Sequence, residues 1–408
     1  MDEPAGGKLN GLLAHRGAIG LLVTGWLMWL FVGAWAITPS SVLPLTMEAF
    51  GIRETAASWI ITAPQIAAVV AGLPVGMLLD TFDRGRAVLA SVLLLVFVGV
   101  ANSVLAAGGH YEALLGTRVL GGFALVTMWI AQTAMITRAF PNRREATAVS
   151  IFVTGYPAGY AVGQLTAPLI SDLLHWTSTF GVYALVGFGF GAMFWLIDTQ
   201  IEKQTLVESS PSGSDLRRAL LDRGVWGVGV ISFLSYMVYM IYNSWMPTYL
   251  SSTFAIGLAR SGAYTAMFPA IGFLARPVGG YLSERGFGGR ALPVIAMSFL
   301  GAGVVAGLMG WNRELIVLVA GLLLAGFAIQ LQFGLLYTLV QRYVPRNVGG
   351  TAVSVVSTVG WLGTFLGPPI VGAIIEGTGT YVAVFAAAVG LSVGGLLTVL
   401  VLTEPPVR

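Results

Sequence analysis

The stretch GMLLDTFDRGR at residues 76–86 returns 204 residues later as GYLSERGFGGR at residues 280–290. Three further matches occur at the same offset: GFA at 122–124 and 326–328, TAVS at 147–150 and 351–354, and the glycines Gly159 and Gly163, which recur as Gly363 and Gly367. Four matches at one offset make coincidence improbable. The sequence therefore consists of two halves that repeat one structural unit.

The chain around these matches is strongly apolar. Of its 408 residues, 56% are hydrophobic and 10% are charged, with a mean hydropathy of +0.83, whereas soluble domains carry roughly 25% charged residues. A helix needs about 20 apolar residues to cross a membrane. An all-α integral membrane protein is predicted, with twelve spans at approximately 18–45, 56–79, 87–107, 113–137, 146–170, 179–198, 225–249, 262–282, 291–310, 315–340, 351–375 and 381–402.

The longest polar interval, residues 201–224, divides the spans into two sets of six. We expect an N-terminal six-helix bundle over residues 1–200, a cytoplasmic linker over 201–224 and a C-terminal six-helix bundle over 225–408. Because six is even, both bundles cross the membrane in the same sense. Parallel repeats related by an axis along the membrane normal, with a site between them, are typical of transporters that work by rocking of the halves.

Basic residues predict the orientation of the spans. Of the 21 Lys and Arg residues, sixteen fall on the side of the termini and the linker, and only Arg53, Arg260 and Arg313 fall on the other. Because cytoplasmic loops carry the excess of Lys and Arg, both termini are expected in the cytoplasm of a multi-pass protein of the cell membrane. The two remaining basic residues, Arg118 and Arg276, lie within predicted spans 4 and 8.

Several motifs resemble those of the major facilitator superfamily, and the resemblance covers essentially the whole chain. The superfamily's loop between spans 2 and 3 reads approximately G-x-L-x-D-R-x-G-R-R, and this chain has Gly76, Leu78 and Asp80 followed by TFDRGR. The span 4 motif, R-x-x-x-G, is present as Arg118 and Gly122. The glycine-rich span 5 motif is similar to GYPAGYAVG at 155–163, and GWLGTFLGPPIVG at 360–372 is its relative in span 11. The resemblance implies two pseudo-symmetric six-helix bundles and transport by alternating access.

Span 8 most resembles the nitrate/nitrite porters. In ARPVGGYLSERGFGG at 275–289, Arg276 matches the arginine that precedes a Gly-Gly pair and coordinates the anion in that family. Gly72 stands where the family has a second arginine, in span 2. NSWMPTYL at 243–250 is similar, more broadly, to the anion and cyanate permeases. The resemblance implies a small anionic substrate held by Arg276.

The depth of Arg276 in the membrane also favours an anion. Arg276 lies eight residues from Glu284, which at about 1.5 Å per residue is roughly 12 Å into the hydrocarbon core. All eighteen acidic residues fall in termini, loops or the last turns of spans, so none pairs with Arg276 at this depth. A central arginine costs roughly 2.5–3.5 kcal/mol, which a bound anion would offset. Two alternatives remain open: Arg276 binds carbonyls of a helix broken at Pro277, or it snorkels toward the cytoplasm.

Other polar and aromatic residues are candidates for the substrate pathway. Tyr239 and Asn243 share a face of span 7, whereas Gln330 and Gln332 cannot share a face of span 10. Ordinary aromatic packing and interhelical hydrogen bonds are the alternatives for these residues, and for Arg118 a structural role is the alternative. The candidate substrate-binding residues are Arg276, Arg118, Gln65, Tyr239, Asn243, Gln330, Trp129 and Tyr160.

Conformational change is expected to involve the repeated loops and the glycine rows. Asp80 and Glu284 are expected to act as paired cytoplasmic latches. The resemblance to the superfamily implies that Asp80 meets the N-terminus of span 11 near residues 350–351 and that Glu284 meets that of span 5 near 146–147, where a carboxylate is favourable. Glycines at small-xxx-small spacing let helices approach closely, which suits either swivelling helices or tight static packing. The candidate gating residues are Asp80, Arg84, Arg86, Glu284, Arg290, Gly159, Gly163, Gly363 and Gly367.

The sequence predicts a secondary active or facilitative transporter of an inorganic anion or small carboxylate, not an enzyme. With no cysteine, phosphate-binding loop or metal-ligand cluster, it is expected to use no cofactor, metal or nucleic acid and to be a monomer in the lipid bilayer. The lack of a mid-membrane carboxylate favours exchange or facilitated movement over proton symport. The alternatives are an exporter of drugs or amphiphilic metabolites and, in another class, a non-transporting membrane sensor or scaffold.

Overall fold

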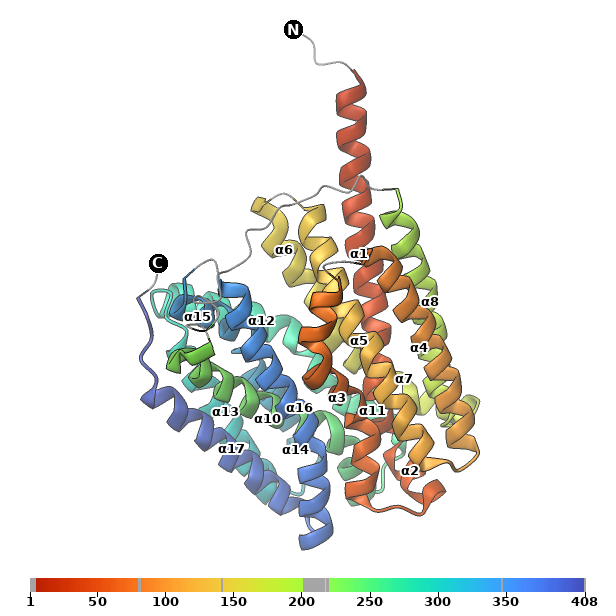
Figure 1. The fold of residues 1–408 in the computed structure, drawn as a ribbon. Coiled ribbons are helices and arrows are strands. Elements are labelled where there is room, and N and C mark those ends of the chain that lie inside the picture. The colour runs from red at the N-terminus through yellow and green to blue at the C-terminus, as the bar shows by residue number, and fades with distance from the viewer. Residues whose placement is uncertain are drawn as a thin grey trace.

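The computed structural model describes residues 5–79, 82–140, 142–200, 217, 220–345 and 348–406, and within these ranges it contains helices and no strands. Figure 1 shows the N-terminal half, in red to yellow, beside the C-terminal half, in green to blue. The expected linker at 201–224 lies mostly outside the described residues. In chain order the helices are α1 (Ala5–Ser41), α2 (Leu43–Phe50), α3 (Glu54–Leu79), α4 (Arg84–Ala107), α5 (Tyr111–Ala139), α6 (Asn142–Val153), α7 (Gly155–Leu173), α8 (Ser178–Asp198), α10 (Arg223–Phe254), α11 (Leu258–Ala270), α12 (Gly272–Tyr281), the π-helix η1 (Leu282–Gly286), α13 (Leu292–Trp311), α14 (Leu315–Gln330), α15 (Phe333–Tyr343), α16 (Gly349–Thr378) and α17 (Tyr381–Val401).

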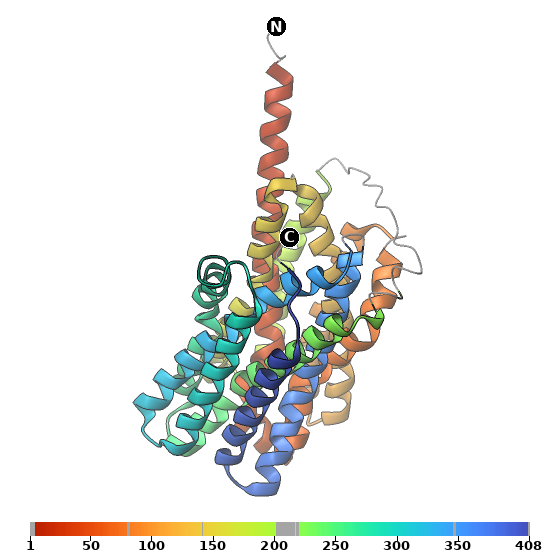
Figure 2. The ribbon, with the colours of Figure 1, turned by 90° about the vertical axis from the view of Figure 1, so that its left-hand side faces the viewer.

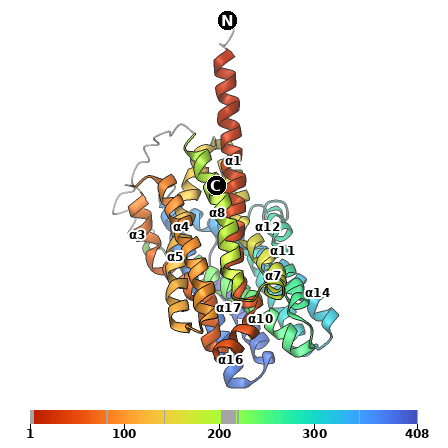
Figure 3. The ribbon, with the colours of Figure 1, turned by 90° about the vertical axis from the view of Figure 1, so that its right-hand side faces the viewer.

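Ten segments of the described chain are long and apolar enough to cross a membrane. The other two predicted spans, 146–170 and 262–282, are each divided between two shorter helices, α6 with α7 and α11 with α12. These ten segments, one of which is divided between α14 and α15, and the two interrupted spans make the twelve spans that hydropathy predicted. Figures 2 and 3, which face the C-terminal and N-terminal halves, show α1 projecting beyond the other helices at the end where the chain begins.

The interruption between α6 and α7 has a local cause at Thr154. The Thr154 hydroxyl donates to the Ile151 carbonyl oxygen at 2.6 Å and accepts a hydrogen bond from Trp26 Nε1 at 2.9 Å. Pro157, one turn later, has no N–H to donate to the carbonyl of Val153. The helix therefore changes direction where a side chain and a proline replace regular backbone hydrogen bonds.

The four predicted gating glycines make close helix contacts inside each half. A Cβ atom on Gly159 of α7 would overlap the Leu30 carbonyl oxygen of α1, and one on Gly363 of α16 would overlap the Phe233 carbonyl oxygen of α10. Gly163 and Gly367 continue these two contacts along the same helix pairs. Spans 5 and 1 are thus packed in one half as spans 11 and 7 are in the other, which is the pseudo-symmetry that the repeat predicted.

A second pair of equivalent contacts joins spans 4 and 2, and spans 10 and 8. A Cβ on Gly122 of α5 would overlap the Pro64 carbonyl oxygen of α3, and a Cβ on Gly326 of α14 would lie 2.5 Å from the Phe268 carbonyl oxygen of α11. Both members of the second contact lie 204 residues after those of the first. At this contact the packing of the two halves matches residue for residue.

The halves meet tightly at the end of the bundle where α3 begins and α16 ends, which we call the closed end. The Thr55 backbone N–H donates to Glu376 Oε1 at 2.8 Å, and Arg53 Nη2 donates to the Glu376 carbonyl oxygen at 3.3 Å. A Cβ on Gly372 would lie 2.9 Å from the Glu54 carbonyl oxygen. Glu376 of the C-terminal half thus binds the N-terminus of a helix of the N-terminal half, as a carboxylate at a helix N-terminus favourably does.

A second set of contacts between the halves lies deeper, on spans 5, 7 and 8. Gln164 Nε2 of α7 donates to the carbonyl oxygen and to Oδ1 of Asn243 in α10, at 3.0 and 3.1 Å. A Cβ on Gly262 of α11 would overlap the Gln164 carbonyl oxygen. The rings of Trp59 in α3 and Phe365 in α16 lie 5.5 Å apart. These contacts seal the halves together between the closed end and the middle of the bundle.

Candidate functional site

Arg276 follows the interruption of span 8, which falls at Ile271, two residues after Pro269. Its Nη2 donates to Gln330 Oε1 at 3.3 Å, and its guanidinium carbon lies 5.4 Å from the centroid of the Phe333 ring. Its Nε is buried and has no hydrogen-bond partner among the described residues. No ion pair with Arg276 occurs in the described part of the chain. The site therefore holds a cation whose charge is unbalanced and whose Nε–H is free to donate.

Arg276 also lines a recess between the interruptions of spans 5 and 8. The recess is small and partly open to its surroundings. Since Arg276 supplies its only formal charge, the recess offers an anion one strong partner and otherwise apolar or hydroxyl-bearing walls. The lining residues are Thr154, Pro157, Pro269, Gly272, Phe273 and Arg276.

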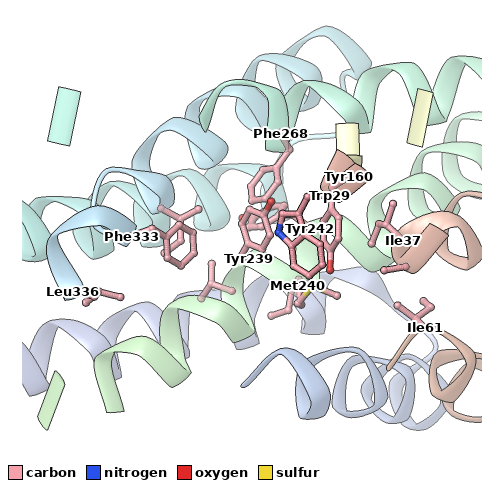
Figure 4. Packing of buried hydrophobic residues seen from close by; sticks show 14 of the residues in the cluster. Trp29, Ile37, Ile61, Tyr160, Tyr239, Met240, Tyr242, Phe268, Phe333 and Leu336 are labelled. Carbon is pink, nitrogen blue, oxygen red and sulfur yellow. The ribbon is translucent and has the colours of Figure 1, made fainter. Parts of the chain in front are cut away.

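Aromatic rings lead from Arg276 into the contact between the halves. Tyr239 of α10 lies 5.5 Å from Phe333 and 5.5 Å from Phe268. Its ring stacks at 6.2 Å on Tyr160 of α7, in the other half. Figure 4 shows Tyr239, Tyr242 and Phe268 grouped together, with Phe333 on one side and Tyr160 on the other. Arg276 is close enough to Tyr239 to interact with it electrostatically.

The row of rings continues through the N-terminal half to span 4. Tyr160 lies 5.0 Å from Tyr156, Tyr156 lies 5.2 Å from Trp29, and Trp29 stacks on Trp129 at 5.4 Å. Three residues predicted separately from the sequence, Tyr239, Tyr160 and Trp129, are therefore connected to Arg276 through one chain of ring contacts. Aromatic rings lower the local dielectric constant, so the attraction between the charge of Arg276 and an anion is stronger beside them than it would be in water.

Two other predicted binding residues use their amides to join helices. Asn243 donates from Nδ2 to the Tyr239 carbonyl oxygen at 2.8 Å and accepts from Gln164 across the halves. Gln330 accepts from Arg276 and donates from Nε2 to the Phe268 carbonyl oxygen at 2.8 Å. The structure thus brings Gln330 to the guanidinium, whereas Asn243 belongs to the contact that closes the halves.

Arg118 is fully buried, and its donors are directed at the backbone. Its Nε donates to the Ile60 carbonyl oxygen at 2.9 Å, and its Nη1 and Nη2 donate to the carbonyl oxygens of Trp35 and Ala36 at 3.2 and 2.9 Å. The guanidinium carbon also lies 4.2 Å from the centroid of the Trp35 ring. All three nitrogen atoms are occupied, so Arg118 bridges α5 to α1 and α3. This arrangement favours the structural alternative for Arg118.

Gln65 makes its hydrogen bonds within its own helix. In the orientation that satisfies its amide, the nitrogen donates to the Ile61 and Thr62 carbonyl oxygens at 3.3 and 2.9 Å. The side chain is 2% exposed. The amide orientation is assigned from the hydrogen bonds it permits, and it leaves Gln65 without a contact to Arg276.

The predicted latches are placed only in part by the structure. Asp80 lies outside the described residues. Glu284 is exposed on η1, and Thr147, its expected neighbour, is exposed on α6. No hydrogen bond or ion pair of Glu284 is found among the described residues, so the structure contains no latch from Glu284 to Thr147. The absence fits a bundle that is closed at the opposite end.

The other predicted gating residues flank the first turns of α4 and α13. Arg84 and Arg86 begin α4, where the Arg86 backbone N–H donates to Asp83 Oδ1 at 2.9 Å. Arg290, before α13, has its Nε 4.0 Å from Glu404 Oε2, and Arg342 Nη1 donates to Glu404 Oε1 at 3.0 Å.

Sequence reasoning missed Glu404, Glu376 and Gln164. Glu404 also accepts from the backbone N–H groups of Ala291 and Leu292 at 2.6 and 3.0 Å, so it caps α13. The repeat gave no signal for Glu404, because the residue 204 positions earlier is Gln200. Gln164 did have a signal, since it directly follows the glycine row of span 5 as a polar residue in an apolar segment.

Comparisons with known proteins agree with this architecture. A model of the Major Facilitator Superfamily matches residues 18–368 and 228–408 of the chain. The nitrite extrusion protein of Bacillus subtilis (strain 168) is 23% identical over 372 residues, which cover 90% of this chain and 88% of that protein. The probable nitrate transporter NarT of Staphylococcus carnosus (strain TM300) is 26% identical over 364 residues, covering 88% of each.

Among solved structures, the chain is similar to a bacterial homologue of the human lysosomal transporter Spinster in an inward-facing and unoccupied conformation. The two superpose with a TM-score of 0.75 at 16% sequence identity, over 94% of each chain. Two pseudo-symmetric bundles of six spans, repeated motifs at one offset and a family match over most of the sequence lead to one assignment. The chain belongs to the Major Facilitator Superfamily.

Proposed function

We propose that this protein carries a small inorganic anion of the nitrate or nitrite class across the cell membrane by alternating access. The observation that carries the proposal is the guanidinium of Arg276, which lies beside the Phe333 ring. Among the described residues, its buried Nε–H has no partner and no acidic residue pairs with it. A planar guanidinium presents donors in a fixed fork that suits a flat anion. The relatives named as nitrite and nitrate transporters support the same substrate class.

We also propose that the termini lie in the cytoplasm, as the basic loops predict. The closed end, held by Glu376 and supported by the deeper Gln164 contact, then faces the outside. The structure is accordingly an inward-facing state, in which the latches at Asp80 and Glu284 are expected to be released. They are expected to form when the cytoplasmic ends of the halves come together.

Counterflow in proteoliposomes tests the proposed function. Vesicles loaded with nitrate or nitrite should take up labelled nitrite faster than empty vesicles. A pH gradient should change the initial rate of uptake little, because the sequence predicts no acidic residue in the middle of a span that could carry a proton. Uptake driven by the proton gradient alone would contradict exchange. Stimulation by internal amphiphilic cations but not by either anion would instead support the alternative of an exporter of amphiphiles.

A separate prediction concerns Glu376, which joins the two halves at the closed end. Glu376→Gln keeps the shape of the side chain but removes its charge from the N-terminus of α3, which weakens the contact by about 0.3–1 kcal/mol. Because the natural chain has no cysteine, Phe365→Cys places a single thiol opposite Trp59, between the halves. Adding Glu376→Gln should raise labelling of that thiol by an impermeant external reagent about two- to fivefold.

Glu314→Gln is the control for this prediction. Glu314 is also at the closed end of the bundle, but its side chain is exposed and makes no hydrogen bond across the halves among the described residues. It should leave labelling unchanged. Equal labelling in both variants would show that Glu376 does not hold the outer side closed.

A further inference from the structure

We propose that Gln330 is a positioning residue for Arg276, and that Gly272 provides the space that lets Gln330 reach it. The inference rests on the proposed function and deepens it, because it names the residues that orient the anion-binding guanidinium. Gln330 would act through Arg276 and not by touching the anion. The unit of Gly272, Arg276 and Gln330 would then determine the preference for a flat anion.

The first step is the double hydrogen bond of Gln330. Its Oε1 accepts from Arg276 in α12, and its Nε2 donates to the Phe268 carbonyl oxygen in α11. One amide therefore spans both sides of the interruption at Ile271. Gln330 is completely buried, so its amide has no water to exchange for these partners. The hydrogen bond from Nη2 to Gln330 restrains the orientation of the guanidinium, and its Nε–H has no partner among the described residues.

The second step is the close approach that Gly272 permits. A Cβ on Gly272 would overlap Gln330 Oε1, the same atom that accepts from Arg276. Any larger residue at this position would push the amide away from the guanidinium. Gly279, about two turns further along α12, is equally close to the Leu331 carbonyl oxygen. Two glycines thus press α12 onto the end of α14 on either side of Arg276.

The third step is a comparison with the other half of the same chain. The packing scaffold is retained there, since Gly122 meets Pro64 as Gly326 meets Phe268. The positions 204 residues before Gly272, Arg276 and Gln330 are Ala68, Gly72 and Val126. All three members of the unit are therefore replaced together on an otherwise equivalent scaffold. Helix packing alone does not require Gln330, because the N-terminal half packs with Val126 in its place.

The test compares anion preference in counterflow for the wild type, Gln330→Met and Gly272→Ala. Gln330→Met keeps similar length but loses both hydrogen bonds, and a hydrogen bond to a charged group is worth about a tenfold change in affinity. We expect the half-saturating nitrite concentration to rise about tenfold with a maximal rate within about twofold of wild type. The chloride concentration that half-inhibits nitrite counterflow should change little, because chloride is spherical and does not need guanidinium donors in a fixed plane. Gly272→Ala should reproduce this pattern.

Gly280→Ala is the matched control, because a Cβ at Gly280 of the same helix would meet nothing within 4 Å. It should leave the half-saturating concentration unchanged. If Gln330 has only a structural role, Gln330→Met should melt at a lower temperature and should bind nitrite and chloride more weakly to the same degree. That result would overturn the inference. If Gln330→Met does not fold, Gly272→Ala decides by the same criteria.

The failure of this inference differs from a failure of the proposed function. If Arg276→Ala abolishes nitrite binding while Gln330→Met and Gly272→Ala bind like wild type, the positioning role is wrong and the anion site stands. If Arg276→Ala itself binds nitrite like wild type, the proposed site is wrong and the positioning role falls with it. If Arg276→Ala, Gln330→Met and Gly272→Ala all lose preference for nitrite and Gly280→Ala keeps it, the anion site and the positioning role are both supported.

Discussion

Arg276→Ala is expected to lower nitrite affinity at least about 100-fold and to abolish counterflow. The expected change follows from the loss of two charge-assisted hydrogen bonds between the guanidinium and nitrite, each worth about 1.5–3 kcal/mol. Arg276→Lys keeps the charge but loses the planar fork, so affinity should fall about tenfold while measurable counterflow remains. Isothermal titration of the three purified proteins with nitrite gives the affinities.

The melting temperature of the same three proteins separates the anion role from its alternative. The protein gives Arg276 one side-chain hydrogen bond, at 3.3 Å, and leaves its Nε without a partner in the described residues. Removing such a charge from the membrane should not destabilise the fold. If Arg276 instead ties together a broken helix, Arg276→Ala should melt at a clearly lower temperature and impair every substrate alike.

Arg118→Met is expected to have the opposite profile. The substitution removes three hydrogen bonds to carbonyl oxygens and the contact of the guanidinium with Trp35. At about 0.6 kcal/mol for each hydrogen bond in a membrane and about 1 kcal/mol for the cation–π contact, unfolding should become easier by roughly 3 kcal/mol. Thermal melting in detergent should show a lower midpoint, and expression should fall.

The fraction of Arg118→Met protein that remains folded is expected to keep the wild-type preference between nitrite and chloride. Arg118→Lys is the graded control, because one ammonium group can replace only part of the hydrogen bonds that the guanidinium makes. Its melting temperature should lie between those of the wild type and Arg118→Met. A stable Arg118→Met protein that has lost nitrite binding would contradict the structural role and return Arg118 to the substrate site.

The architecture was predictable because the signals that carry it extend over the whole sequence. Twelve apolar runs, one repeat offset and the distribution of basic residues each report on many residues at once. The interruptions of spans 5 and 8 were not predicted as positions, since they depend on where individual side chains find partners. Thr154, for example, breaks its helix together with Trp26, which lies 128 residues earlier.

The centre of the candidate site was predictable for a different reason. An arginine at membrane depth with no acid at the same level is visible in the sequence alone, and Arg276 met that description. Its relationship to Gln330 was not visible, because the two residues are 54 positions apart on different spans. The sequence allowed only one of Gln330 and Gln332 to face the pathway, and the structure brings Gln330 to Arg276.

Residues that close the halves were the hardest to predict. Glu376 reads in the sequence as an ordinary acid at the end of a span, and its role depends on the N-terminus of α3 in the other half. Asn243 was expected to line the pathway, but in this state it accepts a hydrogen bond from Gln164 across the halves. Its contribution to binding stays a prediction that concerns the outward-facing state, in which this contact would open.

The most direct test of the central claim is a structure of the protein saturated with nitrate. The account predicts one anion in the recess beside Gly272, with an oxygen about 2.7–2.9 Å from Arg276 Nε, as charge-assisted hydrogen bonds are, and with the anion against Phe333. The hydrogen bond from Arg276 to Gln330 should persist. Nitrate bound elsewhere in the bundle, with Arg276 Nε donating to a helix carbonyl, would contradict the account.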